Sequence, residues 1–369
     1  MAATSYRYIF ADVKTNAILG ELPITGVNFD QKLNTYGSFA AHILLTGIDT
    51  TKFNLANATI PDKCALYIDR NGIIVWGGVI THSLYKSKTQ TLELNAFEWL
   101  WWLSKRIIKN TSIFTTQDQC FIAKQLVVNA QAETYGDVGL LYNQEAGSTI
   151  ISGVLVSQSY FAFETKQVLQ SVNDLAQANG GFDYAIDCYY DGAGVIQKSF
   201  NIYYPRRGIA YSSAITIPVL ELPAGNIVDY EYPRDGSIAA NTIYGVGAGN
   251  NDGKLIATAQ DASKVTGGWT LLEDVINNSS VTDATLLANL ATAEVTARSY
   301  PPTTIKVILN PNQDPVYGSY EVGDDVRLRI TDNFFPDGYD ATWRIVALAV
   351  KAGETSAEQI TLTLAQNTL

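Results

Sequence analysis

The chain has 369 residues, of which 47% are hydrophobic, 11% aromatic and 17% charged. This composition excludes a disordered chain, and the length predicts two to three domains. The net charge of −11 argues against a surface that binds nucleic acid or an anionic membrane, because both need Lys and Arg. The three cysteines form no CxxC motif and make a poor disulfide framework, so we expect folding in a reducing cytoplasm.

Residues 1–105 predict a first antiparallel β module. Strands are expected at Tyr6–Ala11, Val27–Leu33 and Ser38–Thr46, and short strands at this spacing indicate a sandwich or barrel. The N-terminus lacks the apolar core of a signal peptide, and no apolar run approaches the ~18 residues of a membrane span. A short helix is expected between residues 97 and 109, where three Trp cluster.

The strongest local signal in the chain is a hairpin. Asn71-Gly72 lies between the apolar runs Ala65–Ile68 and Ile73–Ile80, and Asn-Gly favours a two-residue type I′ turn. Gly77-Gly78 predicts a bulge or a close approach of another backbone. Thr91–Leu94 alternates again, which predicts a third strand.

Residues 106–215 predict a small α+β outer domain. One helix should follow a capping box at Thr116–Gln119, and a second should span Thr165–Asn179 until Gly180-Gly181 ends it. A hairpin of Phe182–Tyr190 and Lys198–Tyr204 should follow. The residues expected on the buried helical faces are Ile122, Leu126 and Ala130, and then Val168, Val172 and Leu175.

Residues 216–249 and 299–369 predict a second β module, and residues 250–298 an inserted loop and helix subdomain. Asn241–Val246 is expected as a strand of the module, and Asn250–Ser280 is polar and Gly-rich. The inserted helix should span Thr282–Arg298 and end before Pro301-Pro302. Its expected buried face is Leu286, Leu290 and Ala297.

The two β modules share a pattern that indicates an internal repeat. Pro61–Ile68 aligns with Gly323–Ile330, a Trp follows in each at Trp76 and Trp343, and Thr-Leu-x-Leu closes both. The alternative is that any two β meanders share such alternation. The common order of turn, strand, Trp strand and closing strand favours a duplicated module.

Motifs for chemistry are weak, so we expect no enzyme and no catalytic, cofactor or metal residues. His42 and His82 have no zinc-binding context, and Gly245–Gly249 is followed by turn residues where a dinucleotide loop would open a helix. The acidic pairs Asp324-Asp325 and Asp337 with Asp340 suit a hydrolase, but turns and strand starts favour Asp for backbone capping.

Other side chains leave binding open as an alternative. Asp187 and Asp191 lack the ligand spacing of a calcium loop. Tyr189-Tyr190 and Tyr203-Tyr204 flank one turn, and such pairs could bind sugar or protein, although cross-strand packing is the simpler interpretation.

Several stretches resemble minor tail proteins of phages with long non-contractile tails. They are Leu22–Val27, Leu66–Ile80, Tyr203–Gly208, Gly323–Ile330 and Phe335–Gly338. The resemblance extends from about residue 6 to 365, and its motifs are structural hairpins. It implies two tube-like antiparallel β-barrel modules and a small α+β domain in each chain. No peptidase, lysozyme or fibre domain follows Leu369, so we expect no lytic activity of this chain.

Such proteins are baseplate hubs at the tail tip, and the resemblance implies a homotrimer whose six modules match a six-fold tail. The expected partners are the distal tail ring, the tail tube or tape-measure end, and a central spike or fibre. The protein is expected in the virion after assembly in the host cytoplasm, with a lumen that DNA crosses without specific binding. The alternative is a carbohydrate-binding receptor module at the tail tip.

Overall fold

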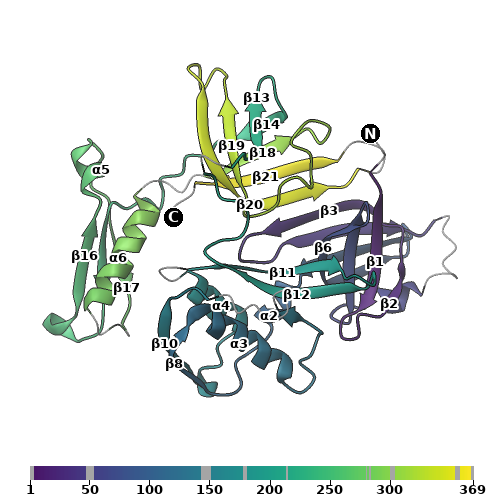
Figure 1. The fold of residues 1–369 in the computed structure, drawn as a ribbon, viewed down its shortest axis with the longest axis horizontal. Coiled ribbons are helices and arrows are strands. Elements are labelled where there is room, and N and C mark those ends of the chain that lie inside the picture. The colour runs from purple at the N-terminus through teal and green to yellow at the C-terminus, as the bar shows by residue number, and fades with distance from the viewer. Residues whose placement is uncertain are drawn as a thin grey trace. The chain divides into compact units, whose positions relative to one another are not determined.

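The computed structural model describes residues 4–46, 54–142, 151–177, 181–212, 215–279, 281, 284–299, 304–353 and 358–366. Strands dominate these residues (Figure 1), which confirms a mainly β fold with added α+β elements. The chain divides into two compact units. The first is Met1–Pro218 with Leu309–Asp325 and Ile345–Thr361, and the second is Val219–Ile308 with Val326–Arg344 and Leu362–Leu369. Each unit is described by itself.

The first unit is built on one antiparallel sheet. Its order is β20-β3-β4-β7-β6-β5-β1-β2. The strands are β1 (Tyr6–Asp12), β2 (Ile18–Glu21), β3 (Thr25–Lys32), β4 (Ser38–Leu44), β5 (Cys64–Arg70), β6 (Ile73–Lys86), β7 (Thr91–Glu98) and β20 (Tyr339–Lys351). The short helix α1 (Leu55–Ala58) precedes β5. The recorded pairings of these described strands form an open path, where the resemblance implied a closed barrel.

The predicted hairpin is confirmed. Asn71 and Gly72 join β5 to β6 with φ of 55° and 85°, as a type I′ turn requires. β6 continues through Gly77 and Gly78 without a break. The expected close approach is present, because a Cβ on Gly78 would lie 2.1 Å from the carbonyl oxygen of Phe97.

The α+β elements of the first unit follow β7. They are α2 (Leu100–Ser104), β8 (Ser112–Asp118), α3 (Gln119–Ala132), β9 (Leu141–Tyr142), β10 (Leu155–Tyr160), η2 (Ala162–Glu164), α4 (Val168–Ala176), β11 (Asp183–Tyr190) and β12 (Ile196–Tyr203). β8 pairs with β10, β11 with β12, and β9 runs parallel to β12. The six side chains expected on the buried faces of α3 and α4 are all buried, which confirms both helical patterns.

The expected capping box of α3 is wrong by two residues. Thr116 belongs to β8, where it lies at a bulge with φ of 50°, and β8 continues to pair with β10 as far as Asp118. Asp118 is the N-cap instead, and its carboxylate accepts a hydrogen bond from the Cys120 N–H at 2.8 Å. At the end of α4, Gly180 lies outside the described residues.

One hydrophobic core serves both the sheet and these α+β elements. Ile9, Tyr67 and Trp99 belong to the same buried cluster as Ile122 and Phe200. Since this core spans the expected boundary at residues 105 and 106, the α+β elements and the sheet bury their apolar surfaces together.

The second unit contains two groups of strands. In one, β13 (Val219–Leu222) runs parallel to β19 (Asp325–Ile330), and β14 (Ile227–Glu231), β18 (Thr304–Leu309) and β21 (Gln359–Ala365) are neighbours in that order. In the other, β15 (Thr242–Val246) lies between antiparallel β16 (Ile256–Gln260) and parallel β17 (Glu273–Asn277). The short helices η3 (Asn251–Gly253) and α5 (Ala262–Thr266) and the longer α6 (Ala284–Arg298) complete it.

Two expectations for the insertion differ from the structure. The strand β15 pairs with β16 and β17 of the insertion, so the expected boundary at residue 249 divides this sheet. The helix α6 is present, but it buries Leu287, Ala291 and Val295, whereas Leu290 is exposed. The apolar sequence of α6 allows more than one face, and packing against Ile243 of β15 selects this one.

The repeat is visible in the order of strands. β5, β6 and β7 are successive neighbours, and so are β19, β20 and β21. Trp76 of β6 and Trp343 of β20 are both buried at about 1% exposure or less, which confirms the shared order of strands. Among the described residues, no helix is both long and apolar enough to cross a membrane.

Candidate functional site

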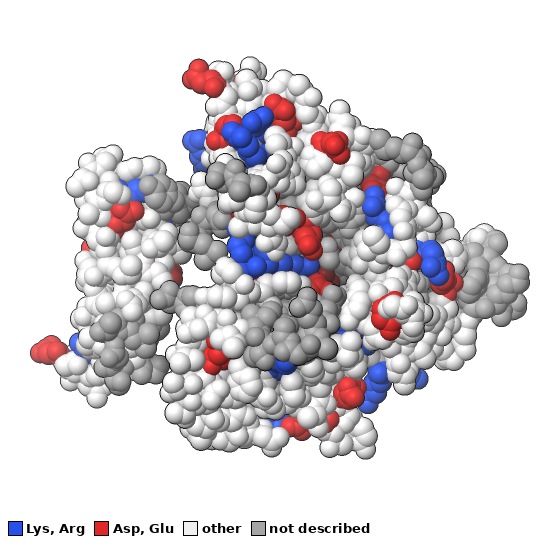
Figure 2. Space-filling model, viewed as in Figure 1, with Lys and Arg blue, Asp and Glu red and all other residues white. Residues whose placement is uncertain are grey.

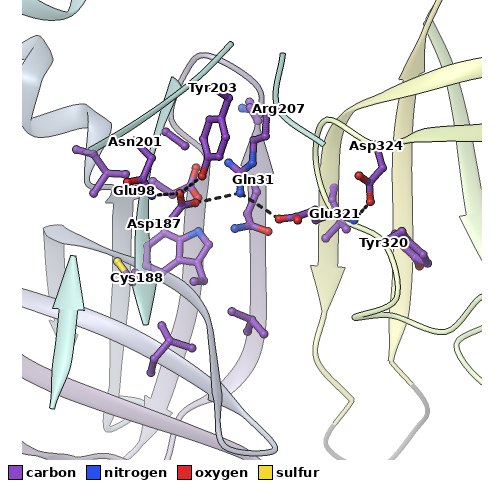
Figure 3. Close-up of a pocket in the computed structure, with 18 of the residues that line it drawn as sticks. Gln31, Glu98, Asp187, Cys188, Asn201, Tyr203, Arg207, Tyr320, Glu321 and Asp324 are labelled. Carbon is purple, nitrogen blue, oxygen red and sulfur yellow. Dashed lines mark hydrogen bonds and ion pairs between the residues drawn. The ribbon is translucent and has the colours of Figure 1, made fainter. Parts of the chain in front are cut away.

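A pocket of about 840 Å³ lies within the first unit. Its walls come from segments that are distant in sequence: β3, β6, β7, β11 and β12, and the stretches around residues 207 and 317–324. Figure 3 shows the polar side chains that gather along it. This volume is in the range of sites that hold a ligand.

Arg207 is the centre of the polar network. Its Nη2 lies 3.0 Å from Oδ1 of Asp187 and 3.3 Å from Oε2 of Glu321 (Figure 3). The hydroxyl of Tyr203 and the amide of Asn201 both donate to the other oxygen of Asp187. The carboxylates of Asp187 and Glu321 keep the pKa of Arg207 above its ordinary value in spite of burial. This arrangement holds the charges of Arg207, Asp187 and Glu321 in place.

The neighbouring Arg206 forms a second link to the same returning segment. Its Nη2 lies 2.7 Å from Oδ1 of Asp325, and both side chains are buried. The other oxygen of Asp325 accepts from the Tyr211 N–H at 2.7 Å, and Asp324 accepts from the Ile209 N–H at 2.6 Å. We call these contacts of residues 206–211 with residues 323–325 the arginine clasp.

Glycines allow the two backbone segments of the arginine clasp to approach each other closely. Gly208 and Gly323 have φ of 80° and 106°, which is a conformation that side chains with Cβ rarely adopt. A Cβ on Gly208 would lie 2.3 Å from the carbonyl carbon of Gly323. Two motifs of the sequence resemblance, Tyr203–Gly208 and Gly323–Ile330, therefore meet in space.

A second ion pair secures another returning segment of the first unit. Arg70 donates from Nε and Nη2 to the two oxygens of Glu358 at 2.8 and 2.9 Å. The Tyr6 hydroxyl also donates to Glu358, and the guanidinium of Arg70 lies 4.7 Å from the ring centre of Tyr317. Burial and the carboxylate of Glu358 raise the pKa of Tyr6. Such bidentate pairs fix geometry as well as charge.

Glu98 is the unusual carboxyl of the pocket. Burial raises its pKa to about 8, and the neighbouring carboxylates of Asp30 and Asp187 act in the same direction. The Gly37 N–H, which donates to Oε2 at 2.5 Å, and Arg207 oppose this shift. Glu98 is therefore largely protonated at neutral pH.

We expect Glu98 to make stability fall as pH rises. The unfolded state loses this proton near pH 4.5 and the folded state near pH 8, so the folded state binds more protons in this window and the free energy of unfolding decreases. Glu98→Gln should remove this slope, and its melting temperature relative to the parent should increase from pH 5 to pH 8. Glu93→Gln on the same strand is the control, and parallel curves for Glu98→Gln and the parent would contradict the assignment.

The structure places the predicted candidate residues in structural roles. His42 and His82 lie in β4 and β6, and among the described residues no cluster of three His, Cys, Asp or Glu could hold a metal. Asp340 pairs with Arg327. Asp324 and Asp325 cap backbone N–H groups as expected, but those groups belong to residues 209 and 211 as well as to their own turn.

The tyrosines of the β11–β12 hairpin are partly tied down. The hydroxyl of Tyr190 donates to Asp69 at 2.8 Å, and that of Tyr203 donates to Asp187. For Tyr190 and Tyr203 these hydrogen bonds favour a packing role over sugar binding. The site residues that we did not foresee are Glu98, Arg70 and Glu358, because their partners are distant in sequence.

Acidic and basic side chains are interspersed on the face that Figure 2 shows.

Comparison with known proteins gives fold neighbours only. No protein-family model matches the sequence, and no curated protein sequence matches it. Among solved structures, a tail protein from Neisseria meningitidis MC58 is 13% identical, with a TM-score of 0.61 over 98% of this chain and 97% of that chain.

Two further solved structures are similar to this chain over nearly its whole length. The 43 kDa tail protein of prophage MuSo2 from Shewanella oneidensis is 13% identical, with a TM-score of 0.61 over 98% of each chain. The prophage tail protein gp18 from Listeria monocytogenes EGD-e is 16% identical, with a TM-score of 0.54 over 98% of this chain and 95% of that chain. The chain therefore has the fold of these tail proteins, two of which come from prophages, along nearly its whole length.

Proposed function

We propose that the chain is a structural protein of a phage tail and forms the hub at the tail tip. The observation that supports this most strongly is the fold shared with three prophage or phage tail proteins over 98% of the chain. The arginine clasp and the Arg70–Glu358 pair are consistent with it, because both lock returning segments into a rigid unit.

In this proposal three chains form a ring. The repeat of β5–β7 in β19–β21 gives each chain two related modules, so a trimer presents six to a six-fold tail. Partners above would be the tail tube, the tape-measure end or the distal ring, and partners below a central spike or fibre. The net charge of −11 suits a lumen through which DNA passes without binding.

The oligomeric state tests the hub proposal. Light scattering on the purified chain should give a mass near three times the 40.2 kDa of one chain, with a concentration-dependent monomer fraction. A chain that stays monomeric at high concentration and binds no purified tail protein contradicts the proposal. Binding to a glycan array by that monomer would favour the receptor-module alternative instead.

A further inference from the structure

The pocket has an apolar wall as well as charged groups. Ile73 and Ile209, which are 68% and 55% exposed, lie on its lining, whereas Trp76 and Leu348 on the same lining are about 1% exposed. Large exposed apolar side chains at the rim of a pocket are typical of sites that receive another molecule. The wall therefore offers contact to an aliphatic group that enters from solvent.

The charged groups that line the pocket differ in how many ion pairs and hydrogen bonds they make. Its two cations are already engaged, since Lys32 pairs with Asp30 at 3.1 Å and Arg207 is shared between Asp187 and Glu321. Glu98 differs. Among the described residues its carboxyl accepts a single hydrogen bond, which comes from the Gly37 N–H.

The other acidic groups make the pocket selective for cations. Both oxygens of Asp324 accept backbone N–H groups, and Glu321 is 65% exposed at the side chain. Four carboxyl residues, Glu98, Asp187, Glu321 and Asp324, and two basic residues lie on the lining. The lining therefore carries one net negative charge while Glu98 is protonated, and two once Glu98 ionises. An entering cation would gain from this excess, whereas an entering carboxylate would be repelled.

We infer that this pocket receives an arginine or lysine side chain of another tail protein, with an aliphatic residue of the same segment against Ile73. A peptide segment fits better than a small cation, because the pocket combines the acidic groups with an apolar wall. The inference rests on the proposed structural role, and it specifies the chemistry of a partner at this site.

Binding should be coupled to the proton on Glu98. The charged groups that act on Glu98 are Asp30 of β3, Asp187 of β11 and Arg207. Cys188 of β11 also interacts with Glu98, and Lys32, Tyr203, Glu321 and Asp324 lie on the same lining. A guanidinium binds the ionised carboxyl, so it must displace a proton below pH 8. The apparent affinity should therefore rise about tenfold per pH unit between pH 6 and 8 and then level off.

The experiment uses the full chain and two blocked dipeptides as probes. Acetyl-arginyl-leucine amide is titrated at pH 6 to 9 by calorimetry, with acetyl-citrullinyl-leucine amide as its neutral isostere. We expect the arginine probe alone to bind, with an affinity that rises at least 30-fold from pH 6 to 8. Equal binding of the citrulline probe, or an affinity that does not change with pH, overturns the inference.

Two variants complete the test. Glu98→Gln should bind the arginine probe weakly and without pH dependence, and its fold can be checked from its unfolding curve. Glu93→Gln, on the same strand but outside the pocket lining, should bind like the parent. Unchanged binding by Glu98→Gln overturns the inference. A trimer that fails to bind the arginine probe refutes this site alone, whereas a monomer that binds the probe but no purified tail protein refutes the hub alone.

Discussion

Asp325→Ala should lower the free energy of unfolding by about 3–5 kcal/mol, because it leaves the buried guanidinium of Arg206 without its carboxylate. The two side chains are 7% and 2% exposed and lie 2.7 Å apart. The substitution also removes the acceptor of the Tyr211 N–H. Urea-induced unfolding followed by tryptophan fluorescence measures the loss.

The second unit supplies a matched control. Asp340 also lies 2.7 Å from an arginine, Arg327, but the two side chains are 46% and 41% exposed. Exposed pairs contribute about 0–1 kcal/mol, so Asp340→Ala should change stability by less than about 1 kcal/mol. If both variants lost the same free energy of unfolding, burial would not be the reason why the Arg206–Asp325 pair stabilises the protein.

Gly78→Ala should prevent stable folding or cost more than about 3 kcal/mol, since one added methyl group overlaps fixed backbone. Its Cβ would lie 2.1 Å from the carbonyl oxygen of Phe97 and 2.6 Å from Cη2 of Trp76. β6 is paired on both sides at this residue, with Leu66 and with Glu98. The strand therefore cannot shift to relieve the overlap without losing one of its two ladders.

Gly192→Ala is the control that separates steric overlap from the replacement of a glycine by alanine. A Cβ on Gly192 meets nothing within 4 Å, and neither glycine has a positive φ. Gly192→Ala should therefore stay within about 0.5 kcal/mol of the parent. Soluble expression, circular dichroism and the urea midpoint of both variants are the measurements, and a parent-like midpoint for Gly78→Ala would contradict the packing argument.

The sequence predicted those parts of the fold that local chemistry determines. Asn71-Gly72 needs only its own two residues to specify the turn, and the spacing of Val168, Val172 and Leu175 needs only one helix. The repeat was visible because Trp76 and Trp343 occupy equivalent strands. For such features the local preference and the packed structure agree.

The remaining features depend on partners that are distant in the chain. Thr116 suits a helix cap, but pairing of β8 with β10 continues beyond it as far as Asp118, so the helix begins later. The buried face of α6 is selected by the sheet beneath it and not by its own pattern. The pocket was not predicted, because no local signal relates Glu98 to Asp187 or Arg207 to Glu321.

The pairing of β3 with β20 has a consequence for the order of events during synthesis. Lys32 is matched with Ala347 and Asn28 with Lys351, so the ribosome must translate most of the message before β3 gains its second neighbour. Until then one edge of the nascent sheet exposes unpaired N–H and C=O groups, which are a template for pairing with other chains. Polypeptides that terminate before β20 would keep this unpaired edge, whereas chains that include β20 cover it.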